Sequence, residues 1–417
     1  MTSGTVHIVG AGLAGLSAAV ALVGQRQKVV VHELARHAGG RCRSYFEPAL
    51  GMTIDNGNHL LLSGNARALA FLDKVGGRHL LDEPPHAEFN FFDLAAQKRW
   101  VLRPNDGPVP WWIFSKDRRV PQTQARDYLR LGRLLKAAPC ETVTEKIDEN
   151  TVLYKRLMEP VLLAALNCDP KEGSAQLAAA VIRETLGRGG KACRPLFAAN
   201  GLGPALVDPA ISFIEKNGGE VRFDHSLRSI EWQDARARAL QFDDGRIELG
   251  RDDSIILAVP AWVAKTLVPE LRVPTKYRSI FNAHFAFPSP TNLPKITGVI
   301  NATTEWLFAF DDRLSVTVSS ADRFNEAERE PLARRIWSEI ATIAGIDAAL
   351  PRWQIVKERR ATFAATPDEN ALRPRAQTHW KNLFLAGDWT ATGLPATIEG
   401  AIRSGETAAK LAMAAQL

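Results

Sequence analysis

The sequence predicts an α/β fold, because apolar strand patterns near both ends of the chain lead through glycine-containing turns into helical patterns. Residues 6–9 form a β-type run that continues through GAGLAG into LSAAVALV, which has helical spacing. A second apolar run, KVVVHE, covers residues 28–33. Near the C-terminus we predict a buried strand at residues 383–386 and a helix from about residue 397 to residue 415. A chain of 417 residues suits two packed domains rather than one core.

The GAGLAG turn has the spacing of a Rossmann-type dinucleotide-binding fingerprint. Gly10 permits the tight turn, Gly12 lets the backbone approach a pyrophosphate, and Gly15 lets helix and strand pack closely. The helix that follows directs its N-terminus at the phosphates. Glu33 ends the second strand, at the distance where a carboxylate accepts hydrogen bonds from a ribose diol. These features predict a dinucleotide site formed by Gly10, Gly12, Leu13, Ala14, Gly15 and Glu33.

The segment GGRCRS, residues 39–44, follows directly after Glu33. Its two glycines free the backbone, and Arg41 and Arg43 carry guanidinium forks that suit a phosphate. We predict that Gly40 and Arg41 contact the cofactor. A basic surface turn is the alternative.

The C-terminal segment supplies a second half of the site. A Gly387-Asp388 turn follows the predicted strand, and Asp388 is placed to accept a hydrogen bond from a ribityl hydroxyl. The helix that begins at about Thr397 would direct its free amides and its positive end at the N1–C2=O edge of a flavin. An ordinary amphipathic helix would explain the helical pattern but not the turn before it.

The middle of the chain contains a predicted set of strands between residues 219 and 260. They include a hairpin with an Asp244-Gly245 turn and a last strand that ends at Pro260.

Composition limits the class of protein. Hydrophobic residues make up 46% of the chain and charged residues 24%, with no apolar run of the roughly 20 residues that span a bilayer. The start lacks a basic n-region, so we expect a cytoplasmic protein. The four cysteines have neither paired nor metal-like spacing, and we expect no metal site. The net charge of +6 suits anionic lipid better than nucleic acid, because no nucleic-acid motif occurs.

These blocks together resemble the phytoene desaturase and flavin amine oxidase superfamily over roughly the whole chain. The resemblance implies FAD and a discontinuous Rossmann-type, GR2-like FAD-binding domain of residues 1–75, 200–265 and 380–417. An inserted α+β domain of residues 76–199 and 266–379 would bind substrate. The resemblance also implies that the backbone around Leu227 meets the adenine. Gly387 and Asp388 would meet the diphosphate and ribityl chain, and Ile398 the pyrimidine edge.

Within the superfamily, four segments look like the hydroxysqualene dehydroxylase family. They are DNGNHLLL (residues 55–62), EPVLLAALN (159–167), WLFAF (306–310) and GDWTATGLPATIEGAIRSG. That family reduces hydroxysqualene to squalene on the bacterial hopanoid route. It usually has Gln where Asn58 stands and Thr where Cys168 stands, and Asn58 keeps an amide beside the expected flavin face. The resemblance adds Gly57, Asn58 and Thr397 to the predicted cofactor contacts.

The substrate implied by this resemblance is a C30 isoprenoid. The aromatic cage residue of an amine oxidase is missing, because Thr397 stands at its position. No cysteine lies in the capping loop, so we expect FAD to be held without a covalent bond. A long polyene needs an apolar tunnel. Its candidates are Leu162, Leu163, Phe281, Phe285, Phe287, Trp306 and Phe308, although residues of these types are more often plain core. His284 shares a strand face with Asn282 and is interpreted as a core histidine with satisfied hydrogen bonds.

Removing an allylic hydroxyl as water requires a hydride, which reduced FAD would supply, and a proton. Asp55 and His59 are the candidates for acid catalysis or for ordering a proton-delivering water. A structural turn role for Asp55 is an equal alternative. Only one dinucleotide fingerprint is convincing, since the GRGG segment at residues 187–190 has neither the strand nor the spacing of another. A separate electron donor is therefore expected.

A lipid substrate predicts peripheral contact with the inner face of the cell membrane. In the segment 108–119, Trp111, Trp112, Ile113 and Phe114 stand beside three cations, as at a headgroup boundary. A helix is predicted over 125–137. Its apolar stripe would contain Tyr128, Leu131, Leu134 and Leu135, and its basic stripe Arg126, Arg130 and Arg133. Ordinary packing of this helix against the substrate domain is the alternative.

Two other functions compete with the dehydroxylase. A carotenoid-type polyene desaturase or isomerase would share the fold but remove hydride from its substrate. A prenyl-binding chaperone, similar to the GDP dissociation inhibitors, would bind lipid without flavin catalysis. The GDWTATGLPATIEGA block argues against the chaperone.

Overall fold

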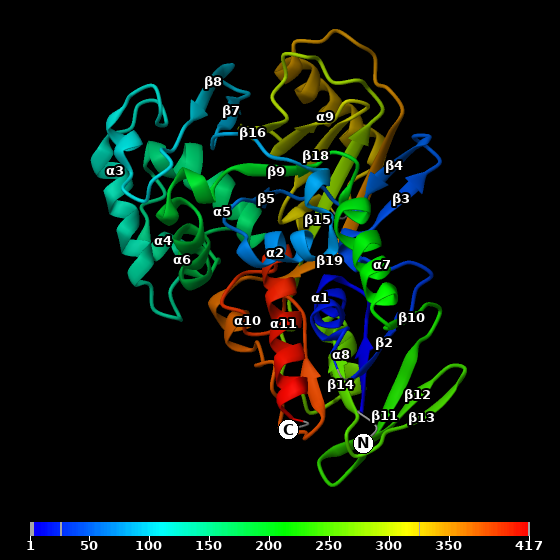
Figure 1. Cartoon of the computed structure of the whole chain (residues 1–417). Coiled ribbons are helices and arrows are strands. Elements are labelled where there is room, and N and C mark those ends of the chain that lie inside the picture. The colour runs from blue at the N-terminus through cyan, green and yellow to red at the C-terminus, as the bar shows by residue number, and fades with distance from the viewer. Residues whose placement is uncertain (1–3, 26, 325, 416–417) are drawn as a thin grey trace.

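The computed structural model describes residues 4–25, 27–324 and 326–415. The outermost residues of the predicted ranges 1–75 and 380–417 lie outside the described part. The first and last described segments lie at the same end of the molecule, where the first and last long helices run side by side (Figure 1).

A five-stranded parallel sheet forms the part of the molecule near the termini, so the predicted α/β class is confirmed. Its strand order is β10-β2-β1-β14-β20, and every neighbouring pair is parallel. The strands are β1 (Thr5–Val9), β2 (Lys28–His32), β10 (Glu220–Arg222), β14 (Ser254–Leu257) and β20 (Leu383–Leu385). Burial on both faces explains why β1, β2, β14 and β20 appear in the sequence as nearly continuous apolar runs, whereas the edge strand β10 is partly exposed and carries two charged residues.

Helices α1 (Leu13–Leu22) and α11 (Ile398–Ala414) pack against each other beside this sheet. A side chain at Gly405 would overlap the carbonyl oxygen of Ala14, so the backbones approach closely at this point. The Ser17 hydroxyl lies 3.2 Å from the Ile402 carbonyl oxygen and donates to it. Both helices that were predicted to hold the cofactor therefore form one unit, although they come from opposite ends of the chain.

A three-stranded antiparallel sheet, β11 (Leu227–Gln233), β12 (Arg236–Phe242) and β13 (Gly245–Glu248), packs against the parallel sheet, where Phe242 contacts His32 of β2. Phe242 pairs with Gly245, so Asp243 and Asp244 form the turn. The predicted Asp244-Gly245 turn is wrong by one residue, because Gly245 already belongs to the strand.

A seven-stranded sheet dominates the other half of the molecule, in the order β19-β15-β18-β17-β16-β7-β8. Its strands are β7 (Phe89–Asp93), β8 (Lys98–Leu102), β15 (Tyr277–Phe285), β16 (Ile296–Ile300), β17 (Trp306–Ala309), β18 (Leu314–Val318) and β19 (Trp353–Phe363). Helix α9 (Arg329–Ala344) covers one face, where Phe285 packs against Trp337. The opposite face is turned toward the helices and the parallel sheet (Figure 1).

A group of helices lies beside the seven-stranded sheet (Figure 1). It contains α3 (Ala125–Arg130), α4 (Val143–Lys146), α5 (Glu159–Leu166) and α6 (Ala175–Glu184). The single helix predicted over 125–137 is wrong in part, because the α-helix ends at Arg130 and a 3₁₀ turn continues from Leu131 to Lys136. Gly132 weakens the α-helical conformation at this junction.

Shorter elements connect these layers. The helices are α2 (Ala66–Val75), α7 (Asp208–Lys216), α8 (Ala261–Leu267) and α10 (Pro367–Ala371). The strands are β3 (Ser44–Glu47), β4 (Met52–Asp55), β5 (Leu61–Leu62), β6 (Leu81–Asp82) and β9 (Pro195–Ala198). Among the described residues, no helix has the length and apolar character needed to cross a membrane.

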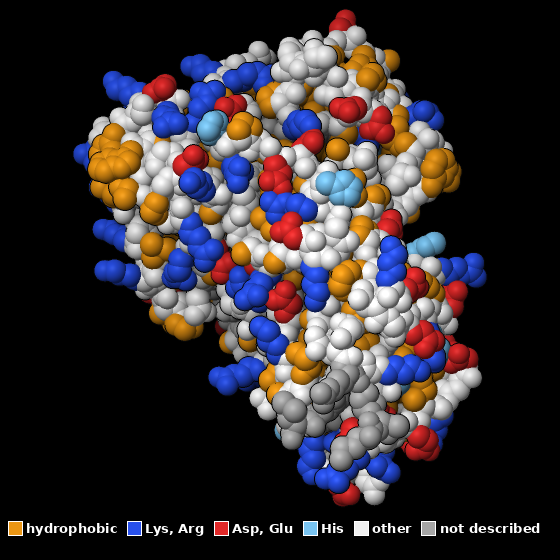
Figure 2. Space-filling view, viewed as in Figure 1, with side chains coloured by type: hydrophobic (Ala, Val, Ile, Leu, Met, Phe, Trp, Pro, Cys, Tyr) orange, Lys and Arg blue, Asp and Glu red, His pale blue; other side chains and the backbone are white. Residues whose placement is uncertain are grey.

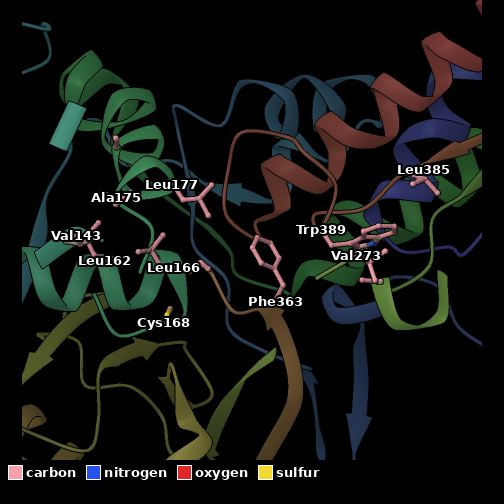
Figure 3. Close-up of a cluster of buried hydrophobic side chains, with 14 of the residues drawn as sticks. Val143, Leu162, Leu166, Cys168, Ala175, Leu177, Val273, Phe363, Leu385 and Trp389 are labelled. Atoms are coloured by element: carbon pink, nitrogen blue, oxygen red, sulfur yellow. The ribbon is translucent and has the colours of Figure 1, made fainter. Parts of the chain in front are cut away.

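All strands of the parallel sheet come from residues 1–75, 200–265 and 380–417, and all strands of the seven-stranded sheet come from the other two predicted ranges. The domain boundaries themselves remain a proposal. Strand β9 belongs to the predicted substrate range 76–199, yet it pairs with β5 of the predicted cofactor range 1–75. One hydrophobic core also extends between the two halves (Figure 3). There Phe363 lies between Leu177 of α6 and Trp389 of the loop before α11.

Candidate active site

The β1–α1 turn has the geometry that its glycines predict. Gly10 adopts a φ of +106°, and its N–H donates to the His32 carbonyl at 2.8 Å. A side chain at Gly15 would overlap the Gly10 carbonyl oxygen. Among the described residues, an added Cβ at Gly12 would meet nothing within 4 Å, and no side chain caps the start of α1. The first amides of α1 therefore face open space without an intrahelical acceptor.

Glu33 lies beside this turn. Its carboxylate accepts hydrogen bonds from the amides of Ala11 at 2.7 Å and Ala35 at 2.9 Å. Each oxygen keeps a second lone pair for a ribose hydroxyl. Leu227 begins β11 close by, because the amide of His225 donates to the Glu33 carbonyl at 2.9 Å. The residues predicted for the ribose and the adenine thus lie together.

Three buried histidines form a hydrogen-bonded chain behind this end of the site. His32 lies between His7, at 3.0 Å, and His225, at 2.8 Å, and His225 in turn contacts Asp244 at 2.9 Å. Since the Asp244 carboxylate accepts, the hydrogens point along the chain from His7 toward Asp244. Burial lowers the pKa of His7 to about 4 and that of His32 to about 2, so both rings are neutral at pH 7.

Arg41 connects the two ends of the chain within the site. Its guanidinium lies 2.7 Å from the Asp388 carboxylate and also donates to the Ala361 carbonyl. Burial lowers the pKa of Arg41, but the charge of Asp388 and its hydrogen bond outweigh this effect and raise it on balance. The turn that carries Arg41 lies against the fingerprint, because Gly39 donates to the Ala11 carbonyl at 2.8 Å and an added Cβ at Gly40 would approach Gly12.

The start of α11 is aimed at the same region. The Thr397 side chain caps the helix by accepting from the Gly400 amide at 3.0 Å, which leaves the amides of Ile398 and Glu399 without an intrahelical acceptor. The Ser404 hydroxyl accepts from the Gly387 amide at 2.8 Å, and this bond ties the Gly387-Asp388 turn to α11.

Asp55 is buried at the end of β4. The Ser44 hydroxyl at 2.5 Å and the Leu202 amide at 3.0 Å both donate to its Oδ1. Burial raises the pKa of Asp55 above its ordinary value, although these two hydrogen bonds lower it. The carboxyl group therefore accepts two structural hydrogen bonds, and its raised pKa favours the protonated form.

His59 has a defined tautomer. Its Nδ1 lies 2.7 Å from the Gly57 carbonyl, which can only accept, so Nδ1 carries the hydrogen. Burial lowers the pKa of His59, while the Gly57 bond and the charge of Asp55 raise it, and the net direction is downward. The neutral ring presents Nε2 as an acceptor, so His59 suits ordering a water better than donating a proton.

Asn58 joins the segment 55–59 to the seven-stranded sheet. Its backbone amide donates to Oδ1 of Asn282 at 3.2 Å, and its side-chain amide donates to the hydroxyls of Ser315 at 2.8 Å and Thr317 at 3.1 Å. The Ser315 hydroxyl also contacts Nδ1 of His284 at 2.8 Å. Gly57 lies over Asn282, because an added Cβ would be 3.0 Å from its Nδ2.

Sequence reasoning missed Asn282, Ser315 and Thr317 as members of this network. Strand alternation placed Asn282 and His284 on one face, but the pairing of β15 with β18 is not readable from the sequence. The interpretation of His284 as fully satisfied is wrong. Its ring is buried, and Nε2 has no hydrogen-bond partner among the described residues.

The apolar candidates divide between the two faces of the seven-stranded sheet. Phe281, Phe285 and Phe287 pack on the α9 side, so they are core residues, as the alternative interpretation of these candidates had it, and not tunnel residues. Trp306 and Phe308 belong with Leu162 to the core on the other side, toward the candidate site. Leu163 is partly buried on α5. A cavity of about 410 Å³ beside the start of α11 is lined by Arg67, Glu184 and Arg403 among others, and it does not suit a polyene.

The comparisons with known proteins agree with this geometry. The family model described as flavin containing amine oxidoreductase matches residues 13–413. The chain is 53% identical to hydroxysqualene dehydroxylase of Rhodopseudomonas palustris, over 99% of each chain. It is 46% identical to the enzyme of the same name from Zymomonas mobilis, over 98% of each chain. The chain belongs to the hydroxysqualene dehydroxylase family.

Solved structures show the same fold at low sequence identity. The chain aligns with cyclohexylamine oxidase from Brevibacterium oxydans with a TM-score of 0.73, 17% identity and 99% coverage of both chains. The predicted superfamily, the Rossmann-type fold and the FAD cofactor are confirmed, and the protein is an FAD-dependent oxidoreductase.

The residues of the site fit FAD. The uncapped start of α1 and the open space at Gly12 suit a diphosphate, which binds well at helix N-termini. Glu33 retains acceptor capacity for a ribose, and the free amides at Ile398 suit the acceptor edge of a flavin. The individual contacts predicted for these residues remain proposals.

Proposed function

We propose that the protein removes the hydroxyl group of hydroxysqualene reductively and releases squalene, as a step of bacterial hopanoid or squalene biosynthesis. The observation that carries the proposal is the identity of 46% to 53% with hydroxysqualene dehydroxylases over nearly the whole chain. The site geometry supports it, because Asp55 and His59 lie on a short polar segment, residues 55–59, that is hydrogen-bonded through Asn58 to the seven-stranded sheet.

The reaction breaks the C–O bond, adds one hydride to the carbon and one proton to the oxygen, and gives squalene and water. Reduced FAD supplies the hydride when it is bound. We assign the proton to Asp55, because burial favours its protonated form and the hydrogen bonds from Ser44 and Leu202 both go to the same oxygen. We assign His59 the ordering of water through Nε2. Asp55 and His59 are expected to touch the reacting groups directly.

The cofactor is expected to bind without a covalent bond. We assign its diphosphate to Gly12, Leu13 and Ala14, its ribose to Glu33, its ribityl chain to Asp388 and its pyrimidine edge to Ile398. These assignments are supported by the first amides of α1 and α11, which have no acceptor within their own helix.

The electrons have to come from a separate donor. The GRGG segment supports this view, because residues 186–192 form two short 3₁₀ turns and not a strand–turn–helix unit. Gly189 is needed for packing instead, since a side chain there would overlap the Gly107 backbone.

We propose that residues 109–135 touch the inner face of the cell membrane from the cytoplasmic side. Trp111 is 67% exposed and Phe114 is 62% exposed, whereas Trp112 and Ile113 are buried. Leu129 and Leu135 add exposed apolar area, and Arg126, Arg130 and Arg133 are exposed beside them. Figure 2 shows a hydrophobic group at the left edge of the molecule, over the region of α3, with basic side chains around it. Such a surface suits anionic headgroups.

Product analysis tests the proposed reaction. Chemically reduced, anaerobic enzyme should convert hydroxysqualene to squalene, and the oxidised enzyme should leave hydroxysqualene unchanged. Bleaching of the oxidised flavin by a more saturated polyene, with no squalene formed by the reduced enzyme, would favour a desaturase instead.

A further inference from the structure

Arg373 is a buried cation next to the cofactor loop. It follows α10 and is only 7% exposed. Its Nη2 donates to the carbonyl of Asp388 at 3.0 Å, to the carbonyl of Thr390 at 2.5 Å and to the hydroxyl of Thr392 at 2.9 Å. One side chain thus contacts three successive parts of the loop that leads from β20 toward α11.

The charge of Arg373 is not neutralised by a direct ion pair. In the described part of the chain, no carboxylate lies within 4.0 Å of its guanidinium nitrogens, and the nearby Asp388 carboxylate pairs with Arg41. Burial lowers the pKa of Arg373 to about 10, although the charge of Asp388 raises it, so the group remains a cation at pH 7. Asp388 thus pairs directly with Arg41, and it acts on Arg373 through its charge without a direct ion pair.

The remaining contacts of Arg373 hold it in place. Nη1 donates to the Asn370 side chain at 3.0 Å, and the guanidinium lies over the Phe363 ring, 4.7 Å from its centroid. Helix α10 is itself fixed, because Glu369 accepts hydrogen bonds from the backbone of Thr275 and Lys276. The Arg373 side chain therefore belongs to the predicted substrate range 266–379 and contacts a loop of the predicted cofactor range 380–417.

We propose that Arg373 is a positioning residue for the flavin, which fixes the shape of the loop 387–392 and adds a net positive charge behind it. The planar fork is suited to several acceptors at once, and a lysine amine would reach fewer of them in the same geometry. A buried positive charge stabilises negative charge that develops nearby, and a reduced flavin is more negative than an oxidised one. This role depends on the use of FAD but not on the identity of the substrate.

Three variants separate charge, geometry and general stability. Arg373→Met removes the charge, Arg373→Lys keeps the charge but not the fork, and Arg375→Met makes the same charge change at an exposed position two residues away. The measurements are the dissociation constant of FAD from reconstituted apoprotein, the flavin midpoint potential, and the melting temperature of the apoprotein.

Arg373→Met should weaken FAD binding about tenfold or more, because charged hydrogen bonds to the loop are lost. The flavin midpoint potential should become more negative, because the positive charge that stabilises the reduced flavin is removed. Arg373→Lys should keep a potential close to that of the wild type but recover only part of the affinity, and Arg375→Met should change neither quantity. Wild-type affinity and potential in a folded Arg373→Met protein would overturn the proposal. A lower apoprotein melting temperature with unchanged FAD affinity would also overturn it. If Arg373→Met does not fold, wild-type FAD affinity in Arg373→Lys would overturn the proposal.

Discussion

The carboxylate of Asp388 lies 2.7 Å from the guanidinium of Arg41, and this ion pair joins the turn after β2 to the loop before α11. Both residues were predicted from the sequence as separate cofactor contacts. Their pairing means that each fixes the position of the other, since the Asp388 side chain is buried and Arg41 also donates to the Ala361 carbonyl. The two ends of the chain therefore form the candidate cofactor site together.

Gly12→Val should abolish retention of FAD in a protein that still folds. An added Cβ meets no atom of the described part of the chain within 4 Å, and Gly12 has an ordinary φ of −73°, so the fold accommodates a side chain. The branched side chain would instead occupy the space proposed for the diphosphate. Flavin absorbance of the purified protein is the readout. Gly245→Val, also in open space but outside the fingerprint, is the matched control, and near-stoichiometric FAD in Gly12→Val would refute the assignment.

Asp55→Asn should lower kcat by roughly 100-fold or more, because general acid catalysis typically contributes that much. FAD content should stay the same, because the asparagine carbonyl still accepts the bonds from Ser44 and Leu202. Single-turnover rates of the reduced enzyme measure the effect. A wild-type rate with a lowered melting temperature would assign Asp55 to the structural turn role.

His59→Gln tests the second residue of the same segment. The variant loses the ring nitrogen that is proposed to order water, and kcat should fall by less than in Asp55→Asn, because His59 is neutral and supplies no proton in this account. An identical or larger loss would indicate that the proton comes from His59.

The protein should lose stability as the pH falls below about 6.5. In the folded state the pKa values of His7 and His32 lie far below the unfolded value of 6.5, so the unfolded chain binds more protons between these values. Stability is therefore complete above pH 6.5 and decreases on the order of 2 kcal/mol for each histidine by about pH 5. Asp253 opposes the shift of His7, whereas Arg222 and Lys28 add to it.

Urea unfolding between about pH 5 and 7.5 measures this effect. The double variant His7→Phe and His32→Phe removes both of these rings and should reduce the slope of the pH profile. Burial also lowers the pKa values of His59 and His284, so these two rings account for part of the slope that remains. His79→Phe, at an exposed position, is the control and should keep the wild-type slope. An unchanged slope in the double variant would assign the acid sensitivity to other groups.

Reversing Arg126, Arg130 and Arg133 to glutamate should weaken binding to anionic liposomes. Each cation near an anionic surface contributes on the order of 1 kcal/mol, and salt should have a similar effect because it screens the attraction. Co-sedimentation measures the binding. Reversal of three exposed cations elsewhere, Arg238, Lys381 and Arg251, is the control for net charge. Equal co-sedimentation of wild type and the triple variant would indicate that this segment packs against the rest of the protein and does not bind the membrane.

Local patterns predicted the elements of the fold more fully than the contacts of the site. The fingerprint at Gly10 to Gly15 and the helix near Thr397 were predictable, because glycine spacing and helical periodicity are local properties. The network of Asn58 with Asn282 and Ser315 was not, since strand pairing between distant segments decides which side chains meet. Periodicity could separate the two faces of β15 but not indicate that α9 covers the face of Phe281 and Phe285.

The most direct test of the account is anaerobic turnover of hydroxysqualene by reduced enzyme in heavy water. Reduced FAD exchanges its N5 hydrogen with solvent, so the account predicts squalene with one deuterium on the carbon that carried the hydroxyl group. Squalene without deuterium at that carbon would contradict hydride delivery from the cofactor, and undiminished activity after removal of FAD would contradict flavin chemistry altogether.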